Sequence, residues 1–328
     1  MKVLVTGAAG HIGANLVRGL LHRGDSVQVL VHRRTAGFDG LNVTPIHGSV
    51  SDVSTLLTAM KGVDVVYHLA GAISLSMQDA PLLTRVNVEG TRNVGLACLE
   101  SGVRRMIHFS TTHALSPEPF DAPITEENQL AEQANRPPYD RSKAAAERAL
   151  LTLVDEGLDA VIVNPSGVIG GFDFEPSHMG QFLLDLYFRR LPGLVTGGYT
   201  WVGVRDVVAG ALAAETKGRR GHRYILTSEW LAMPEIAAIA AEITGVKAPR
   251  FVSPRWLALC SVPFASAWGW MRGKPSRLSA MAIDTLYSNP DIRYDKAKQE
   301  LGFEPRPVRD AIAESYAWFE GAGMLKTP

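Results

Sequence analysis

Short apolar runs alternate with stretches of helical spacing along the first half of the chain. The runs are rich in valine, isoleucine and leucine, which predicts buried strands, and the apolar residues between them recur at helical intervals, which predicts helices. Strands that are apolar almost throughout are typical of a parallel sheet covered on both faces. The predicted strands are Lys2–Thr6, Ser26–Val31, Val43–His47, Val63–Leu69, Met106–Ser110 and Asp159–Val163, and the clearest helices are Ile12–Leu21, Val53–Met60 and Pro138–Leu153.

The pattern loosens beyond Gly171, where glycine-rich and aromatic stretches separate shorter periodic segments. We therefore predict an α/β fold: a doubly wound parallel sheet of the Rossmann type in residues 1–171, with a smaller, mostly helical capping lobe in residues 172–328. The chain is expected to cross back to the sheet near residues 200–230. The elements predicted here are a helix that begins near Arg205 with Asp206 as its N-cap, a strand over Arg223–Thr227, and helices over Pro234–Ile243 and Ala311–Phe319.

Composition excludes several classes of protein. The 33 Lys and Arg residues balance the 33 Asp and Glu residues, so no bulk field favours nucleic acid, and we expect no nucleic-acid partner. The two cysteines, Cys98 and Cys260, offer neither a disulfide framework nor metal-ligand spacing, and we expect no metal. The opening apolar run is too short for a signal peptide and leads straight into glycines, which makes the cytoplasm the expected location.

One uncharged, tryptophan-rich segment, Trp256–Met271, needs its own interpretation. It is shorter than the ~20 residues that span a bilayer, and Pro263 interrupts it, so we expect no membrane span. The favoured interpretation is a buried helix or a lid over a pocket. The alternative is contact with a membrane surface through Trp256, Trp268 and Trp270.

Three glycines at three-residue intervals, Gly7, Gly10 and Gly13, join the first predicted strand to the first helix. A turn of this kind needs one glycine to reverse tightly, another to let backbone approach a pyrophosphate, and a third where helix and strand pack closely. The helix N-terminus then presents free N–H groups and a positive dipole end to the anion. The turn predicts a dinucleotide site.

A second constellation follows the fifth predicted strand. That strand delivers Ser110, Thr111 and Thr112 to the carboxyl edge of the sheet, and Tyr139 and Lys143 lie one turn apart on the next helix. A tyrosine with an ordinary pKa of about 10 is a poor acid–base group at neutral pH, and a neighbouring ammonium lowers that pKa. Such a pair can exchange a proton with the alkoxide left by hydride transfer, while a threonine orients the substrate oxygen.

With these motifs, the chain resembles the extended short-chain dehydrogenase/reductase group of the NAD-dependent epimerase/dehydratase superfamily. The resemblance rests on TGAAGHIG at residues 6–13, NVEGTRN at 87–93 and YDRSK at 139–143. The stretches NPSGVIGGFDFEPSHMGQF, TWVGVRDVVAGALAA and GHRYIL resemble the branch of dihydroflavonol 4-reductase-like and 3β-hydroxysteroid dehydrogenase-like enzymes.

The resemblance implies a set of site residues. Thr112, Tyr139 and Lys143 match the catalytic positions, and Lys143 also holds the nicotinamide ribose. Cofactor contacts are implied for Gly7, Gly10, His11, Ile12, Gly13, Ser49, Val50, Leu69, Ala70, Gly71, Ser110, Tyr139, Lys143, Pro165, Ser166 and Val168. Substrate contacts are expected for Ile73, His113, Phe174 and Trp201, although aromatic residues of the lobe are equally well explained as core.

Two positions depart from the family pattern. Ser49 stands where an acidic residue under the adenine is common, and His113 stands where a small residue is usual after Thr112. His113 can therefore bring an extra titratable group to the substrate, or it can be an ordinary loop histidine. His68 is expected to be a packed, hydrogen-bonded histidine instead of a catalytic base.

The end of the second predicted strand bears on the choice of cofactor. His32, Arg33 and Arg34 stand where an NAD-specific fold places an acidic residue for the ribose hydroxyls. Basic groups there can pair with a 2′-phosphate, so NADP(H) is the preferred cofactor and NAD(H) the alternative. A solvated basic loop would explain the same residues.

The resulting hypothesis is an NADP(H)-dependent oxidoreductase that interconverts a ketone or aldehyde and an alcohol. Its expected substrate is a small, apolar molecule, ring-containing compounds included. The alternative is a nucleotide-sugar epimerase or dehydratase with bound NAD, although Asn164-Pro165-Ser166 lacks the arginine common in those enzymes. A non-catalytic NADP-binding redox sensor is disfavoured by the tyrosine–lysine pair.

The family also implies a homodimer through the helices of residues 79–101 and 138–156, with Ala144, Ala145, Ala146 and Ala149 allowing close approach.

Overall fold

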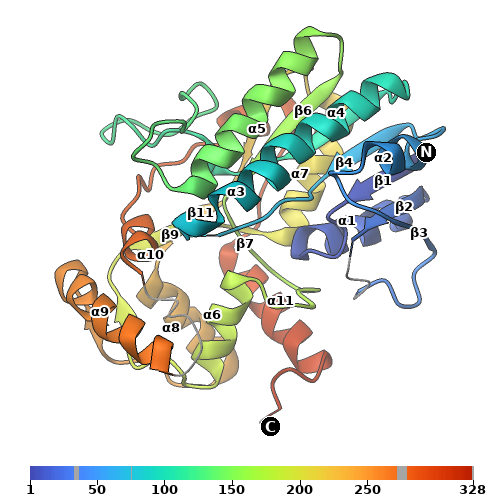
Figure 1. The fold of residues 1–328 in the computed structure, drawn as a ribbon. Helices are drawn as coiled ribbons and strands as arrows, with labels where there is room; N and C mark the ends of the chain where they lie inside the picture. Colours follow the sequence, from blue (N-terminus) through green and yellow to red (C-terminus); the bar gives the residue numbers. More distant parts are fainter. Residues whose placement is uncertain (33–36, 75, 272–278, 327–328) are drawn as a thin grey trace.

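A computed structural model describes residues 1–32, 37–74, 76–271 and 279–326, with side chains left undescribed over 265–271 (Figure 1). The predictions for Arg33, Arg34, Trp268 and Trp270 therefore lie outside what is described.

Seven parallel strands form the main sheet, which confirms the predicted doubly wound α/β fold. Their order is β10-β6-β5-β4-β1-β2-β3, so the winding reverses between β1 and β4. Ligands of open α/β sheets bind at the carboxyl ends of the strands beside such a switch point. The strands are β1 (Lys2–Thr6), β2 (Ser26–Val31), β3 (Val43–His47), β4 (Val65–His68), β5 (Arg105–Phe109), β6 (Ala160–Pro165) and β10 (Arg223–Leu226).

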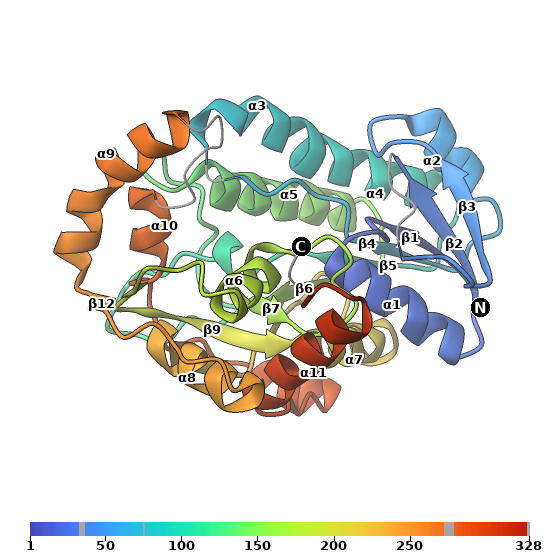
Figure 2. The same cartoon turned by 90° about the horizontal axis from the view of Figure 1, so that it is seen from below.

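Helices cover both faces of this sheet (Figures 1 and 2). One apolar cluster joins the sheet to α1 (His11–His22) and α7 (Val204–Lys217). A second joins the opposite face to α2 (Val53–Ala59), α4 (Gly90–Glu100) and α5 (Pro138–Asp155). The helix that leads into α4 begins with a short 3₁₀ turn, Met77–Asp79, and runs through α3 (Ala80–Leu83) and a π-helical turn, Thr84–Glu89.

The second lobe contains more strand than the sequence predicts. Beside its helices it holds a three-stranded sheet, β11-β9-β7, and a two-stranded one, β12-β8. Most of these strands are too short to show the alternation by which strands are recognised, and β7 and β9 also contain glycine. The elements are β7 (Gly167–Ile169), α6 (His178–Tyr187), β8 (Leu194–Val195), β9 (Gly198–Gly203), β11 (Glu229–Ala232), α8 (Met233–Thr244), β12 (Val252–Ser253), α9 (Arg255–Met271), α10 (Ala280–Thr285), a π-helical turn Ala297–Leu301 and α11 (Val308–Gly321).

Residues 204–226 return to the main sheet, where α7 packs on its face and β10 pairs with β6. The prediction of Asp206 as an N-cap is wrong, because α7 begins at Val204 with Gly203 as its N-cap. Asp206 lies in the first turn, and its carboxylate accepts a 3.0 Å hydrogen bond from Arg306. This ion pair ties α7 to the segment that leads into α11.

The tryptophan-rich helix α9 lies at the outer edge of the second lobe, beside α10 (Figures 1 and 2). Trp256 is 66% exposed and Phe264 is 78% exposed, so the expectation of a buried helix does not hold for these side chains. Across the described part of the chain, no helix has the length and apolar character needed to cross a bilayer. The same residues contain no cluster of His, Cys, Asp and Glu suited to a metal ion.

Candidate functional site

The glycine turn between β1 and α1 leaves no room for side chains. Gly7 has φ +69°, and a Cβ there would lie 2.5 Å from the backbone nitrogen of Ala70. A Cβ on Gly13 would lie 2.3 Å from the carbonyl oxygen of Gly7. Gly10 is the N-cap of α1, whose first-turn N–H groups receive no side-chain cap. This close-packed turn with uncapped N–H groups fits a pyrophosphate.

We predict that Gly13→Ala weakens cofactor binding by about tenfold or more, ~1.4 kcal/mol, because the added methyl group displaces the turn backbone. Titration of the protein with nicotinamide dinucleotides measures the effect. Gly321→Ala is the matched control, since a Cβ there would meet no atom within 4 Å. Unchanged affinity in the Gly13 variant would contradict the assignment of the turn.

His11 ties the glycine turn to the loop after β7. Its Nε2 lies 3.1 Å from the carbonyl oxygen of Gly171, and Asn15 Nδ2 donates to the same oxygen at 2.9 Å. Burial lowers the pKa of His11, which favours the neutral ring. The side chain of His11 therefore positions the loop after β7, and its backbone N–H remains available to bind the anion.

Hydrogen bonds that involve the buried His68 fix the turn after β4. His68 Nδ1 lies 2.7 Å from Thr6 Oγ1, and His68 Nε2 lies 3.0 Å from Thr91 Oγ1. Burial lowers the pKa of His68 to about 3, so the ring is neutral and structural, as predicted. Thr6 Oγ1 also accepts a hydrogen bond from the backbone of Ala70 at 3.2 Å. Residues 69–71, implied as ribose contacts, thereby lie at the carboxyl edge directly beside Gly7.

Asn87 fixes the loop that follows. Its Oδ1 accepts from the backbone nitrogen of Ala72 at 2.7 Å, and its Nδ2 donates to Ser142 Oγ at 2.9 Å. Ser142 Oγ in turn donates to the carbonyl oxygen of Tyr139 at 2.7 Å. Asn87 therefore connects the cofactor edge to the first turn of α5.

On the adenine side, the implied contacts lie at the carboxyl ends of β2 and β3. His32 is exposed at the end of β2, while Ser49 is half-buried and Val50 is buried. Ser49 Oγ accepts a 3.2 Å hydrogen bond from the backbone of Ser51, which shapes the turn.

Lys143 lies under the carboxyl end of β5. Its Nζ donates to the carbonyl oxygen of Phe109 at 2.8 Å. Burial lowers the pKa of Lys143 to about 8, and the negative charge of Glu147 opposes that shift. At neutral pH the side chain is therefore mostly an ammonium, although more easily deprotonated than an exposed lysine.

Tyr139 lies one turn before Lys143 on α5. Burial raises the pKa of its hydroxyl, the Asp140 carboxylate raises it further, and a hydrogen bond with Thr111 lowers it. The pKa of Tyr139 is therefore raised overall, and the predicted net lowering by Lys143 is wrong, since burial has the largest effect. The Tyr139 hydroxyl is thus neutral at pH 7 and suited to donating a proton.

The two threonines after β5 face different groups. Thr111 interacts with Tyr139 and is the N-cap of the 3₁₀ turn Thr112–Ala114, whereas Thr112 lines a pocket. The carbonyl oxygen of Thr111 accepts a 3.0 Å hydrogen bond from Asn164 Nδ2. The motif predicts Thr112 for the substrate oxygen, and the structure adds Thr111 as a residue that hydrogen-bonds with the Tyr139 hydroxyl.

Replacing Thr111 and Thr112 in turn by valine tests whether their hydroxyls have different roles. We predict that Thr112→Val lowers kcat/KM by about 10²-fold, the effect of losing one donor aimed at a developing oxyanion. Thr111→Val should instead raise the pKa of Tyr139, so that alcohol oxidation requires higher pH. Steady-state kinetics in both directions give the comparison. Full activity of the Thr112 variant together with an inactive Thr111 variant would reverse the assignment.

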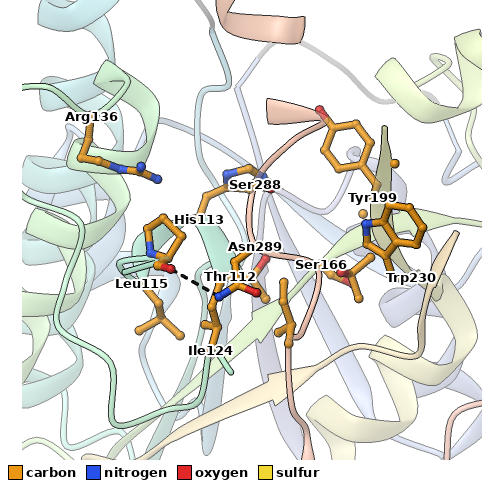
Figure 3. Close-up of a pocket in the computed structure, with 15 residues that line it drawn as sticks. Thr112, His113, Leu115, Ile124, Arg136, Ser166, Tyr199, Trp230, Ser288 and Asn289 are labelled. Carbon is orange, nitrogen blue, oxygen red and sulfur yellow. Dashed lines mark hydrogen bonds between the residues drawn. The ribbon is translucent and has the colours of Figure 1, made fainter. Parts of the chain in front are cut away.

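A pocket opens beside these residues (Figure 3). Tyr199 and Trp230 form an aromatic side, and His113 lies on the side of α5, with its ring centroid 6.4 Å from that of Tyr139. His113 Nδ1 is 3.6 Å from Asp140 Oδ1. Other residues of the lining are Thr112, Arg136, Ser166, Ser288 and Asn289.

Three of the four residues expected at the substrate lie elsewhere. Trp201 is fully buried in the core of the second lobe, where its indole Nε1 donates to Leu231. Phe174 packs against Trp318 and Arg18, and Ile73 is 63% exposed. His113 alone of the four lines the pocket. Sequence reasoning missed Tyr199, Trp230 and Arg136 because they lie on a short strand pair and a long loop without a motif.

The residues between the glycine turn and the pocket fit a nicotinamide dinucleotide. Ser110 Oγ is buried at the end of β5 and has no hydrogen-bond partner among the described atoms, which is unusual for a buried hydroxyl. Pro165 is buried at the end of β6, and Ser166 and Val168 follow half-buried beside it. A cofactor bound along this edge would satisfy Ser110 and reach the Tyr139–Lys143 face.

A model of the NAD dependent epimerase/dehydratase family matches residues 3–226, most of the chain. The chain belongs to the NAD-dependent epimerase/dehydratase family. This membership agrees with the resemblance drawn from the motifs and makes the protein an NAD(P)-dependent oxidoreductase of the extended short-chain type.

Relatives from this family cover the whole chain. Sterol demethylase protein B of Methylococcus capsulatus is 36% identical over 331 residues, which covers 99% of this chain and 100% of that protein. A putative dihydroflavonol 4-reductase of Synechocystis is 35% identical over 98% of this chain and 96% of its own. The crystal structure of gox2253 is 33% identical, with a TM-score of 0.86 and 99% of both chains covered. The second lobe is therefore shared with these family members along with the sheet.

Proposed function

We propose that the protein is an NADP(H)-dependent oxidoreductase that interconverts a ketone or aldehyde and an alcohol on a small, apolar substrate. The observation that carries the proposal is the position of Tyr139 next to His113, which lines the same pocket as Thr112, Tyr199 and Trp230. Tyr139 and Lys143 themselves are not among the lining residues of this pocket. The names of the two relatives, sterol demethylase protein B and a putative dihydroflavonol 4-reductase, support a ring-containing substrate.

The residues divide the work of carbonyl reduction. When bound, the nicotinamide supplies the hydride. The Tyr139 hydroxyl, neutral at pH 7, donates a proton to the substrate oxygen as negative charge develops there. Thr112 holds that oxygen by a hydrogen bond, and the Lys143 ammonium, one helical turn away, stabilises the phenolate that remains. Alcohol oxidation uses the same groups in reverse.

The preference for NADP(H) rests on the sequence that follows β2. Residues 32–36, His-Arg-Arg-Thr-Ala, contain two arginines and no carboxylate. A 2′-phosphate pairs with guanidinium groups, whereas the ribose hydroxyls of NAD are commonly held by an acidic residue.

The cofactor decides between the main proposal and its alternative. The purified protein is denatured, any released nucleotide is identified, and the protein is titrated with NADPH and NADH. We expect an exchangeable site that prefers NADPH, since a reductase must renew its hydride from solution. Tightly retained NAD⁺ would contradict the proposal and support an epimerase or dehydratase, which returns the hydride to the same substrate.

A homodimer through α4 and α5 belongs to the same proposal. Ala145 and Ala149 are half-exposed on the outer face of α5 and can allow close approach of a second copy. Ala144 and Ala146 are buried within the protomer, so their expected part in the contact is wrong. Sedimentation equilibrium of the wild type and an Ala145→Arg variant tests the interface: a variant that remains dimeric would exclude it.

We also propose that α9 contacts an anionic membrane surface. Beside the exposed Trp256 and Phe264, the sequence holds six lysines and arginines and no acidic residue between Glu242 and Asp284. Aromatic side chains within a cationic segment favour the interface of anionic lipids. Co-sedimentation with vesicles of phosphatidylcholine and phosphatidylglycerol should fall at least several-fold in Trp256→Ser/Phe264→Ser, and equal recovery with neutral vesicles would contradict the idea.

A further inference from the structure

The charge distribution in the pocket is uneven. Among the described residues that line it, Arg136 is the one that carries a full charge at neutral pH. The remainder are hydroxyl, amide, aromatic and aliphatic groups, together with His113. In Figure 3, Arg136 lies on the opposite side of the pocket from Tyr199 and Trp230. The pocket therefore presents a cation to one end of a ligand and aromatic rings to the other.

The guanidinium of Arg136 is incompletely satisfied. Among the described atoms, its side chain makes one hydrogen bond, from Nη2 to Asp140 Oδ2 at 3.3 Å. Its Nε is buried and has no partner there. Asp140 is itself shared, since its other oxygen lies 3.6 Å from His113 Nδ1. A buried N–H without an acceptor is rare in proteins and indicates that another group completes the site.

The position of Arg136 links this cation to the reaction. Arg136 precedes Tyr139 by three residues, and Pro137 and Pro138 fix the chain between them at the start of α5. Thr112 and Arg136 line the same pocket, so a substrate whose carbonyl oxygen lies against Thr112 has its neighbouring groups within the reach of the guanidinium.

We propose that Arg136 binds a carboxylate of the substrate, and that the substrate is an oxo acid, or the matching hydroxy acid, whose apolar part packs against Tyr199 and Trp230. The inference rests on the proposed carbonyl–alcohol oxidoreductase function and names its substrate class. A planar guanidinium with a free edge pairs well with a carboxylate. The described lining offers a single arginine, which suits a monoanion better than a diphosphate, because a diphosphate carries more charge than one shared arginine neutralises.

Paired substrates test the carboxylate. Aryl oxo acids with the acid group one, two or three carbons from the carbonyl are compared with their methyl esters, which keep the carbonyl and lose the charge. For at least one spacing, we expect wild-type kcat/KM to favour the acid by tenfold or more. Arg136→Met should reduce that preference below twofold, mainly through KM of the acid, and Arg136→Lys should retain part of it.

The ratio of acid to ester within each variant is the measured quantity. Losing Arg136 also removes the positive charge that partly neutralises Asp140, and the Asp140 carboxylate raises the pKa of Tyr139. That change affects the acid and the ester equally, so it does not alter their ratio. Arg141→Met is the matched control, because Arg141 is exposed on α5 and is not among the pocket residues. Arg136→Gln serves as a second polar variant if the methionine variant does not fold.

A binding measurement keeps this inference separate from the proposed function. Quenching of tryptophan fluorescence reports the binding of 4-phenylbutanoate and of its amide, neither of which can be reduced. Tenfold tighter binding of the acid, lost in Arg136→Met, supports the carboxylate site whatever the catalytic result. Equal binding of acid and amide, or an acid preference that survives in the variant, overturns the inference and leaves carbonyl reduction untouched. Absence of reduction of any pair with NADPH or NADH would instead refute the proposed function.

Discussion

Replacing Tyr139 with phenylalanine should lower kcat by about 10²- to 10⁴-fold, the range that positioned general acid–base groups contribute. The substitution removes the hydroxyl that donates the proton and leaves the ring, which packs edge-on to His113, in place. Cofactor affinity should change little, because the substitution leaves the glycine turn and Lys143 intact. The measurement is steady-state kinetics together with cofactor titration, and retention of more than a tenth of the activity would exclude Tyr139 as the proton donor.

The same residues predict how activity depends on pH. Burial and Asp140 raise the pKa of Tyr139, so the neutral phenol needed for reduction is present throughout the neutral range. Lys143 loses its proton near pH 8, and with it the charge that stabilises the developing phenolate. Reduction should therefore decline as pH rises through about 8, whereas oxidation, which needs the phenolate, should increase with pH.

The sequence predicts more of the structure in the first half of the chain than in the second half. Strands that are buried on both faces need a nearly continuous apolar run, so β1 and β2 have the predicted bounds. The edge strand β3 also has its predicted bounds, although most of its side chains are not buried. The glycine turn and Tyr139–Lys143 are local patterns, and spacing alone places each of them on its element. The positions of these two motifs in the fold can therefore be predicted from the sequence alone.

The pocket could not be predicted in this way. It is assembled from the loop before α5, from β9 and β11, and from the segment after α10, which are remote from one another in the chain. Nothing local distinguishes Tyr199, which lines the pocket, from Trp201, two residues later on the same strand, which is core. Both side chains lie on the same face of β9, because residues two apart in a strand do, so only the packing of the second lobe along the strand decides that Tyr199 lines the pocket and Trp201 lies in the core.

A buried carboxylate beside Lys143 is a second feature that the sequence does not reveal. Glu147 lies one turn after Lys143 on α5 and is fully buried. Its Oε1 accepts from Asn164 Nδ2 at 2.7 Å, and its Oε2 accepts from Arg223 Nε. Since Asn164 also holds the carbonyl oxygen of Thr111, Glu147 connects β6 and β10 to the residues around Tyr139.

Glu147→Gln should therefore affect both stability and the pH profile. Removing one partner of a buried ion pair costs about 3–5 kcal/mol, and the lower end is expected here because Arg223 retains some solvent contact. Denaturant unfolding measures that loss, and Glu132→Gln, which removes an exposed partner of Arg148, should change it by less than about 1 kcal/mol.

The pH profile separates an electrostatic role from a merely structural one. The charge of Glu147 raises the pKa of Lys143, so its removal should move the decline of reduction to lower pH. Arg223→Gln removes the cation that compensates Glu147, and the decline should then move to higher pH. Both variants are destabilised, yet the two shifts have opposite signs. Shifts in the same direction, or none, would show that Glu147 only supports the fold and does not set the protonation of Lys143.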